Sequence, residues 1–266
     1  MMTDSTDIRV STKDLVTTIE ITRPPHNFFD YSLIKQIANA FDEIDANPES
    51  RAILLCAEGK SFCAGANFGD GSRVQTDGSV DGQENRGDAG HLYHEAVRLF
   101  RNKKPIIAAV QGAAIGGGFG LALMPDFRFA APEARFAANF TRLGFHPGFG
   151  LTTTLPRLIG QSKATMMFYT SRRIKGEEAL EIGLIDQLVP LDELRDAAWA
   201  FAREIATNAP LAVQSTRATM RAGLADAVKA ATDHELVEQV WLRKTEDFKE
   251  GIAATSARRT PNFAGR

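Results

Sequence analysis

The sequence has few cysteines, no long apolar run and almost no net charge. Its only two cysteines, Cys56 and Cys63, are too few for a disulfide framework, which favours a reducing compartment. No apolar run approaches the ~18 residues of a membrane-spanning helix, and the polar N-terminus is unlike a signal peptide. A formal net charge of −2 provides no basic field for nucleic acid. We therefore expect a cytoplasmic protein whose partners include neither membrane nor nucleic acid.

The composition is that of an ordinary globular protein, and the apolar pattern changes once along the chain. Hydrophobic residues make up 44% and charged residues 24% of the 266 residues, so a well-buried core is expected. Apolar runs typical of strands alternate with helical spacing up to Val189, whereas from Asp192 onward all spacing is helical. We predict an α/β core over residues 1–191 and a helical region over residues 192–266. Strands are expected at 8–10, 16–21, 52–57, 106–110, 127–130 and 185–189, and helices after a cap at Ser32, at 150–159 and at 163–170.

Three consecutive glycines follow a run of five apolar residues. Ile106 to Val110 predicts a strand buried on both faces, and Gly116 to Gly118 open a short helix rich in Ala and Leu. The first amide groups of a helix lack intrahelical acceptors and carry partial positive charge. Glycines also let a flat acyl group come against the backbone. The segment therefore predicts a place where an oxygen that becomes negative during a reaction is stabilised.

A second loop offers the further amide that a two-donor oxyanion site needs. Ser61 to Asn67 follows the apolar strand predicted at 52–57, just as the glycines follow the strand at 106–110. The alternative interpretation is that both loops are simple tight turns. A dinucleotide-binding turn is a poorer interpretation, because Gly116 to Gly120 lacks the G-x-G-x-x-G spacing and no suitable acid follows.

Together the two segments resemble the crotonase superfamily, also called the enoyl-CoA hydratase/isomerase family. Its signature pairs an F-x-A-G-A-D loop with a P-x-I-A-A-V-x-G-x-A-x-G-G-G segment, and here Asn67 stands where the family commonly has Asp. The stretch from Thr245 to Phe263 matches the family's C-terminal pattern, so the resemblance covers nearly the whole chain. It implies a repeated β-β-α spiral core with C-terminal helices, an acyl-CoA substrate without a separate cofactor or metal, and a homotrimer or hexamer built as a dimer of trimers.

The resemblance also assigns roles to residues. The oxyanion amides of the family fall on Ala66 and Gly117. Lys60 and Lys249 are expected near the phosphates of CoA, where a lysine acts as a point charge. The other expected substrate contacts are Ala64, Gly65, Asn67, Gly116, Gly120 and Phe140.

Two positions depart from the hydratases of the family. These enzymes use two glutamates as acid and base, and the corresponding positions here are Gly120 and Phe140. The aspartate that dienoyl isomerases and dehalogenases carry in the next loop corresponds to Gly148. We therefore expect a less polar acyl pocket and little ordinary hydration.

A substitute acid or base has to come from elsewhere. His146 is a candidate because its pKa suits proton transfer near neutral pH, although it is equally compatible with a loop or subunit contact. Asp70, Glu84 and Glu95 qualify only if the polar segment at 70–90, a candidate lid or a disordered insertion, folds inward. Two hypotheses follow: an isomerase-, decarboxylase- or hydrolase-like enzyme, or an acyl-CoA binding protein or partner subunit that has lost the hydratase pair.

Overall fold

The computed structural model describes residues 7–67 and 92–266 of the chain. The predicted polar segment at 70–90, with the candidate acids Asp70 and Glu84, lies outside the described residues. No helix in the described ranges is both long and apolar enough to cross a membrane.

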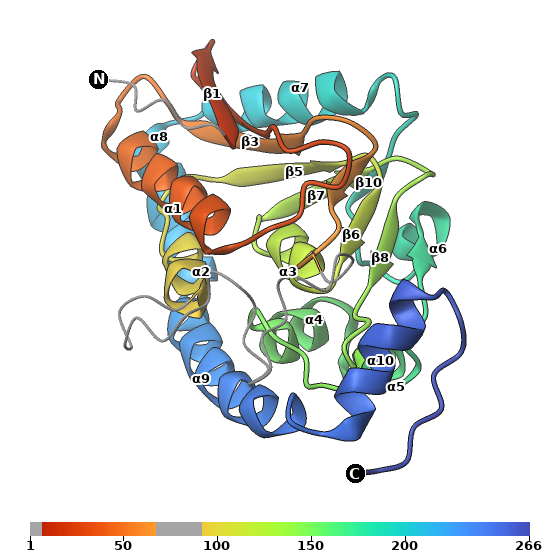
Figure 1. The fold of residues 1–266 in the computed structure, drawn as a ribbon. Coiled ribbons are helices and arrows are strands. Elements are labelled where there is room, and N and C mark those ends of the chain that lie inside the picture. Colours follow the sequence, from red (N-terminus) through yellow and green to blue (C-terminus); the bar gives the residue numbers. More distant parts are fainter. Residues whose placement is uncertain (1–6, 68–91) are drawn as a thin grey trace.

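A six-stranded sheet forms one layer of the molecule, in the order β1-β2-β3-β5-β7-β10 (Figure 1). Its first two strands are antiparallel, and the remaining neighbours are parallel. The central strands β3 and β5 are buried along their whole length, which is what unbroken apolar runs predict. The strands are β1 (Ile8–Lys13), β2 (Val16–Ile21), β3 (Ala52–Ala57), β5 (Ile106–Val110), β7 (Phe127–Ala130) and β10 (Gln187–Leu188).

A second, four-stranded sheet has the order β4-β6-β8-β9. Strand β4 (Ser61–Cys63) follows β3, β6 (Ala113–Ile115) follows β5, and β8 (Arg135–Ala137) follows β7, while the short β9 (Ile174–Lys175) closes the edge. The chain thus passes from the large sheet to the small one and then into a helix, three times in succession. This confirms the repeated β-β-α arrangement. The apolar pattern does not predict β6, β8 or β9, because strands of two or three residues carry no readable alternation.

Helices cover the sheets on the outside and fill the space between them. Helix α1 (Tyr31–Ala46) begins earlier than predicted: its cap is Asp30, whose carboxylate accepts a hydrogen bond from the Leu33 amide at 3.0 Å. The prediction of Ser32 as cap is therefore wrong, since Ser32 already lies in the first turn. The others in this part are α2 (Leu92–Phe100), α3 (Gly117–Leu123), the 3-10 helix η2 (Thr141–Leu143), α4 (Leu151–Ile159), α5 (Gln161–Thr170) and α6 (Gly176–Glu181).

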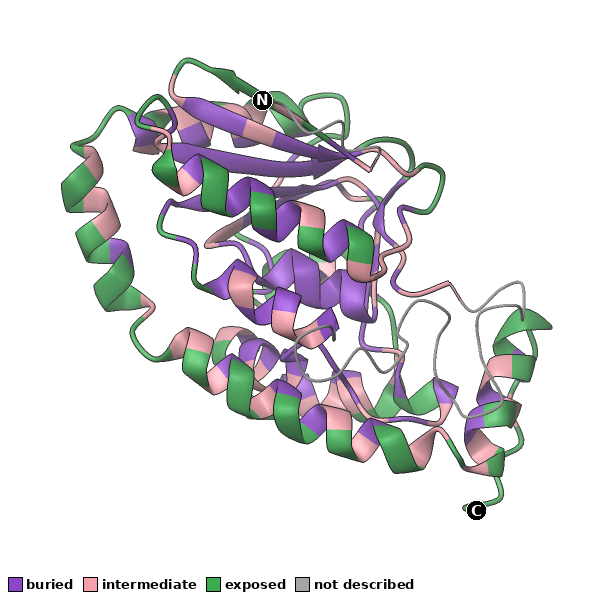
Figure 2. Cartoon of the chain, turned by 60° about the vertical axis from the view of Figure 1, so that its left-hand side comes forward, coloured by how far each residue is buried: buried purple, intermediate pink, exposed green. Residues whose placement is uncertain are grey.

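The last part of the chain is helical, as predicted. It contains α7 (Leu194–Ala206), α8 (Pro210–Met220), α9 (Leu224–Leu242) and α10 (Glu246–Ser256). Helix α7 buries Leu194, Ala198 and Ala202 in the same apolar cluster as Leu54 and Phe129 of the large sheet. Buried residues concentrate in the strands and in the helix faces turned toward them, whereas the outer helices carry wide exposed faces (Figure 2). The division at residues 191 and 192 stays a prediction, although α7 shares the core of the preceding residues.

Candidate active site

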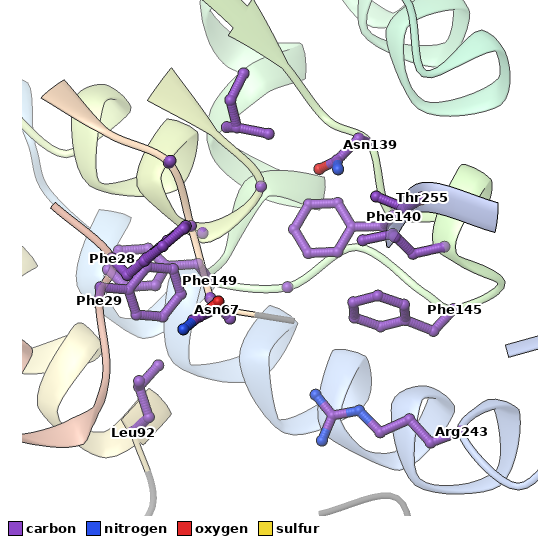
Figure 3. A pocket seen from close by; sticks show the side chains of 18 of the residues that line it. Phe28, Phe29, Asn67, Leu92, Asn139, Phe140, Phe145, Phe149, Arg243 and Thr255 are labelled. Atoms are coloured by element: carbon purple, nitrogen blue, oxygen red, sulfur yellow. The ribbon is translucent and has the colours of Figure 1, made fainter. Parts of the chain in front are cut away.

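A cavity of about 280 Å³ lies where the β4 loop meets the junction between β6 and α3. Its lining is mostly apolar, with aromatic rings from several parts of the chain (Figure 3). The lining residues include Phe28, Phe29, Leu92, Ile115, Phe140, Leu143, Phe145 and Phe149, together with the loop residues Ala64, Gly65, Ala66, Asn67, Gly116 and Gly117.

The two predicted loops lie against each other because β4 and β6 are parallel neighbours. Gly65 has a φ of +80°, and a Cβ atom there would stand 2.6 Å from the Ile115 carbonyl oxygen and 3.8 Å from the Gly117 nitrogen. A Cβ atom at Gly118 would stand 2.1 Å from the Cys63 carbonyl oxygen. Backbone approach this close is possible only for glycine, and it places Ala66 and Gly117 on the same cavity.

The amide groups of Ala66 and Gly117 have no hydrogen-bond acceptor among the described residues. Their neighbours are paired: the Ala64 amide donates to the His26 carbonyl at 3.0 Å, and the Gly116 amide donates to the Ala137 carbonyl at 2.9 Å. Gly117 is the first residue of α3, so its amide precedes any intrahelical acceptor. Two amides without a partner among the described residues therefore belong to residues of one cavity, and both are available to a ligand oxygen.

The cavity has the apolar character that the departures at Gly120 and Phe140 predict. A Cβ atom at Gly120 would lie 2.7 Å from Cδ1 of Phe149, so this ring occupies the space of a side chain at position 120. Gly120 is therefore covered by this ring and absent from the lining, and the expected substrate contact through it stays a prediction. Phe140 does line the cavity, with its ring 5.4 Å from that of Phe145. No Asp or Glu appears among the lining residues in the described ranges.

Besides Gly120, three predicted residues lie outside the cavity lining. Lys60 is exposed, and Lys249 is exposed in an ion pair with Glu246 at 2.9 Å. His146 lines a different hollow beside α5 and α10, with its Nδ1 2.9 Å from the Pro147 carbonyl and its ring 5.9 Å from that of His234. These positions agree with the loop-contact alternative for His146 and leave its catalytic role without support from the geometry.

The structure also places Glu95, the remaining acid/base candidate among the described residues, and the cysteine of the first loop. Glu95 is buried in an ion pair with Arg98 and does not line the cavity. Burial raises the pKa of the Cys63 thiol to about 12, so this thiol is no reactive group. Within the described residues there is no group of His, Cys, Asp and Glu that could hold a metal ion.

Two polar side chains that reach the cavity, Tyr93 and Arg243, are not predicted from the sequence. Both bond to Gln239 of α9: the Tyr93 hydroxyl donates to its Oε1 at 3.0 Å, and the Arg243 Nη2 donates to the same oxygen at 3.0 Å. A Cβ atom at Gly148 would lie 2.0 Å from the Tyr93 hydroxyl, which thus fills the space of a side chain at that position. Burial raises the pKa of Tyr93 and lowers that of Arg243. No motif marks these residues, because they come from helices far apart in the chain.

Comparison with known proteins agrees with this geometry. A family model described as enoyl-CoA hydratase/isomerase matches residues 11–266. The short-chain-enoyl-CoA hydratase of Clostridium acetobutylicum is 34% identical over 241 residues, covering 90% of this chain and 90% of that protein. The 1,2-epoxyphenylacetyl-CoA isomerase of Escherichia coli is 31% identical over 257 residues, covering 94% and 95%.

Solved structures share the fold over almost the whole chain. The enoyl-CoA hydratase/isomerase of Pseudoalteromonas atlantica is 28% identical, with a TM-score of 0.84 over 97% of this chain and 100% of that one. The two mixed sheets with C-terminal helices are therefore the crotonase fold, and the chain belongs to the enoyl-CoA hydratase/isomerase family as an enzyme of the lyase or isomerase class.

Proposed function

We propose that this enzyme binds an acyl-CoA thioester with the carbonyl oxygen between the amides of Ala66 and Gly117. When the α-carbon loses a proton or another group, negative charge moves onto that oxygen, and two fixed donors stabilise the resulting enolate. One such donor typically contributes about 2.7–4 kcal/mol of transition-state stabilisation. The observation that carries the proposal is that both amides are unpaired on one cavity.

The ends of the CoA moiety are proposed to lie outside the cavity. The pantetheine arm would pass along Ala64 to Asn67, all of which line the cavity, so that the phosphates come out near the surface. Lys60 and Lys249 are exposed and are the proposed cations for these phosphates. Such contacts are screened by salt, so their contribution is largest at low ionic strength.

We further propose that the reaction is isomerase-, decarboxylase- or hydrolase-like rather than ordinary hydration. The names of the relatives include both a hydratase and an isomerase, so the local residues have to decide. Hydration needs groups that position and deprotonate water, and the two hydratase positions hold a covered glycine and a phenylalanine. A cavity with this lining favours chemistry on the acyl group itself.

Tyr93 is the proposed proton donor. Tyr93 lines the cavity, and burial raises the pKa of its hydroxyl further above neutral pH, so the side chain is a phenol there. An enolate is a strong base, so a neutral phenol is able to give a proton to the α-carbon. The tyrosinate left by that transfer would regain a proton from water, and in the reverse direction it would accept the α-proton. In the free enzyme the single hydroxyl hydrogen is donated to Gln239, so the hydroxyl would have to turn from Gln239 toward the α-carbon when the substrate binds.

Proton exchange at the α-carbon tests the proposal. We expect the wild type to incorporate deuterium from heavy water into butyryl-CoA, followed by NMR, while hydrating crotonyl-CoA poorly or not at all. Tyr93→Phe should slow the exchange by about 10²–10⁴-fold if the hydroxyl transfers the proton. Hydration of crotonyl-CoA at about 1–10³ per second would overturn the assignment of the reaction. Tight binding without exchange would instead favour the acyl-CoA binding protein.

A further inference from the structure

Arg243 is the one charged side chain among the described residues that line the cavity. It caps the C-terminal end of α9, where the helix dipole favours a cation. Its guanidinium extends from α9 toward the aromatic side chains of the lining (Figure 3). A cation directed into an apolar cavity has to be explained, because removing it from water is unfavourable.

The guanidinium is held in a fixed orientation before any ligand binds. Its central carbon lies 5.5 Å from the centre of the Phe145 ring, and Nη2 donates to Gln239 Oε1 at 3.0 Å. The Phe145 ring packs edge-on against Phe140 at 5.4 Å and against Phe248 at 5.5 Å. Cation–π contact and the hydrogen bond thus leave the remaining donors of the fork, Nε and Nη1, for something else.

No carboxylate of the described residues pairs with Arg243. Three arginines of similar or deeper burial are paired: Arg128 with Asp186 at 3.3 Å, and Arg217 and Arg221 with Asp126 at 2.7 and 2.8 Å. For Arg243 neither an ion pair nor a bond from Nε or Nη1 is formed with any described residue. Arg243 is half-buried at the cavity and has no counter-ion among the described residues, so an anionic group on the ligand would find an unpaired cation there.

The place of Arg243 favours an anion carried by the acyl group over a phosphate of CoA. The cavity of about 280 Å³ is at the small end of ligand pockets, which are typically ~300–1,000 Å³, and its walls are aromatic and aliphatic. It suits a short acyl chain rather than a nucleotide diphosphate. The planar fork of a guanidinium also matches a carboxylate through two parallel hydrogen bonds.

We infer that the substrate is the CoA monothioester of a short dicarboxylic acid, whose free carboxylate binds Arg243 while its thioester oxygen lies between Ala66 and Gly117. This inference rests on the proposed function, since it takes the acyl group to occupy the cavity. The inference adds to the proposed function the chemical class of the acyl group, because the oxyanion amides contact only the thioester oxygen and do not distinguish one acyl group from another. Specificity would come from the carboxylate, because a methyl group in its place leaves Arg243 without a counter-ion.

The test compares two ligands of equal chain length by calorimetry at low salt. Glutaryl-CoA ends in a carboxylate and pentanoyl-CoA ends in a methyl group, and CoA alone measures the contribution of the carrier. We expect the wild type to bind glutaryl-CoA at least tenfold more tightly than pentanoyl-CoA, a difference of about 1.4 kcal/mol. Arg243→Met should abolish this preference and leave pentanoyl-CoA affinity within about threefold, and Arg243→Lys should keep part of it.

Controls separate the possible failures. Lys244→Met removes a charge one residue further along and should behave as the wild type. If Arg243→Met weakened the affinity for all three ligands equally, the arginine would bind a CoA phosphate, and the inference would be overturned. If the wild type bound pentanoyl-CoA as tightly as glutaryl-CoA, the inference would be overturned while the proposed function would stand. This comparison needs no variant. Absence of binding by all three ligands would overturn the proposed function as well.

Discussion

At the scale of single residues, Gly120 has no room for a side chain because the ring of Phe149 covers it. Phe149 is almost fully buried and adopts a φ of +63°, a conformation that is unusual for a bulky residue. Its ring occupies the space that any side chain at Gly120 would need. A glutamate therefore cannot be placed at position 120 by one substitution, because Phe149 would have to move as well.

A proline at position 117 removes the amide hydrogen and is still compatible with the start of α3. Gly117 is the first residue of α3, a position where proline is tolerated and its missing amide hydrogen breaks no intrahelical bond. A Cβ atom there would lie 2.0 Å from Cζ of Phe29, so the experiment uses a Phe29→Ala background. We expect Gly117→Pro to exchange the α-proton about 10²–10³-fold more slowly than Gly117→Ala.

Gly117→Ala is the matched control for this prediction, since it adds the same Cβ atom and keeps the amide hydrogen. Equal exchange rates in the two variants would show that the Gly117 amide does not bind the reacting oxygen. Circular dichroism at the assay temperature establishes that both variants are folded.

The residues of the candidate site divide into those that sequence can predict and those that it cannot. Ala66 and Gly117 are predictable because backbone amides in short contiguous loops leave a readable pattern, and the structure brings both to one cavity. Their oxyanion role itself stays a prediction. Tyr93, Gln239 and Arg243 are not predictable because their proximity depends on how α2 packs against α9, more than a hundred residues apart. The expectation for His146 used its residue type and its place in the loop, and neither shows which way a loop side chain points.

At the scale of elements, the strands with continuous apolar runs are predictable to the residue, whereas helix starts and the edge strands are not. The bounds of β3, β5 and β7 agree with the prediction, because strands buried on both faces leave continuous apolar runs. The small sheet was missed, although β4 and β6 position the two loops of the site. Its strands are held by pairing with neighbours rather than by any pattern of their own.

A buried carboxylate joins the two helices beside the cavity. Glu235 of α9 accepts hydrogen bonds from the Gly150 amide at 2.8 Å, the Thr152 amide at 3.1 Å and the Thr152 hydroxyl at 2.6 Å. It thereby satisfies amides at the start of α4, which has no side-chain cap of its own. Burial raises the pKa of Glu235, while the bonds from Thr152 and Gly150 oppose this rise.

This raised pKa predicts a pH dependence of stability with a definite sign. Because folding favours the protonated form, the contribution is fully present below the ordinary pKa of 4.5 and is lost as pH rises through the folded pKa. Glu235→Gln removes the titration. We expect the melting temperature of the wild type, relative to Glu235→Gln, to fall as pH is raised from below 4.5. A difference that stays constant or rises would contradict the prediction, and Glu204→Gln, at an exposed position of α7, is the control.

At the scale of the whole molecule, the outer helices carry apolar side chains that the described part of the chain does not cover. The exposed fractions are 79% for Leu211, 80% for Met220, 64% for Val237, 51% for Val240 and 52% for Trp241. All five lie on α8 and α9, whereas the strands of the large sheet keep their apolar residues inside. Apolar residues that gather on neighbouring elements in this way are typical of protein–protein interfaces.

We therefore expect a trimer, or a dimer of trimers, in which α8 and α9 contact other subunits. Light scattering after size-exclusion chromatography at micromolar concentration measures the mass directly, and a monomer would contradict the prediction. Placing a charge on this surface should weaken association, so Met220→Glu combined with Val237→Glu is expected to shift the mass toward the monomer. Leu191→Glu is the matched control, because Leu191 is 49% exposed but lies before α7. If the control dissociated and the double variant did not, the interface would lie elsewhere on the molecule.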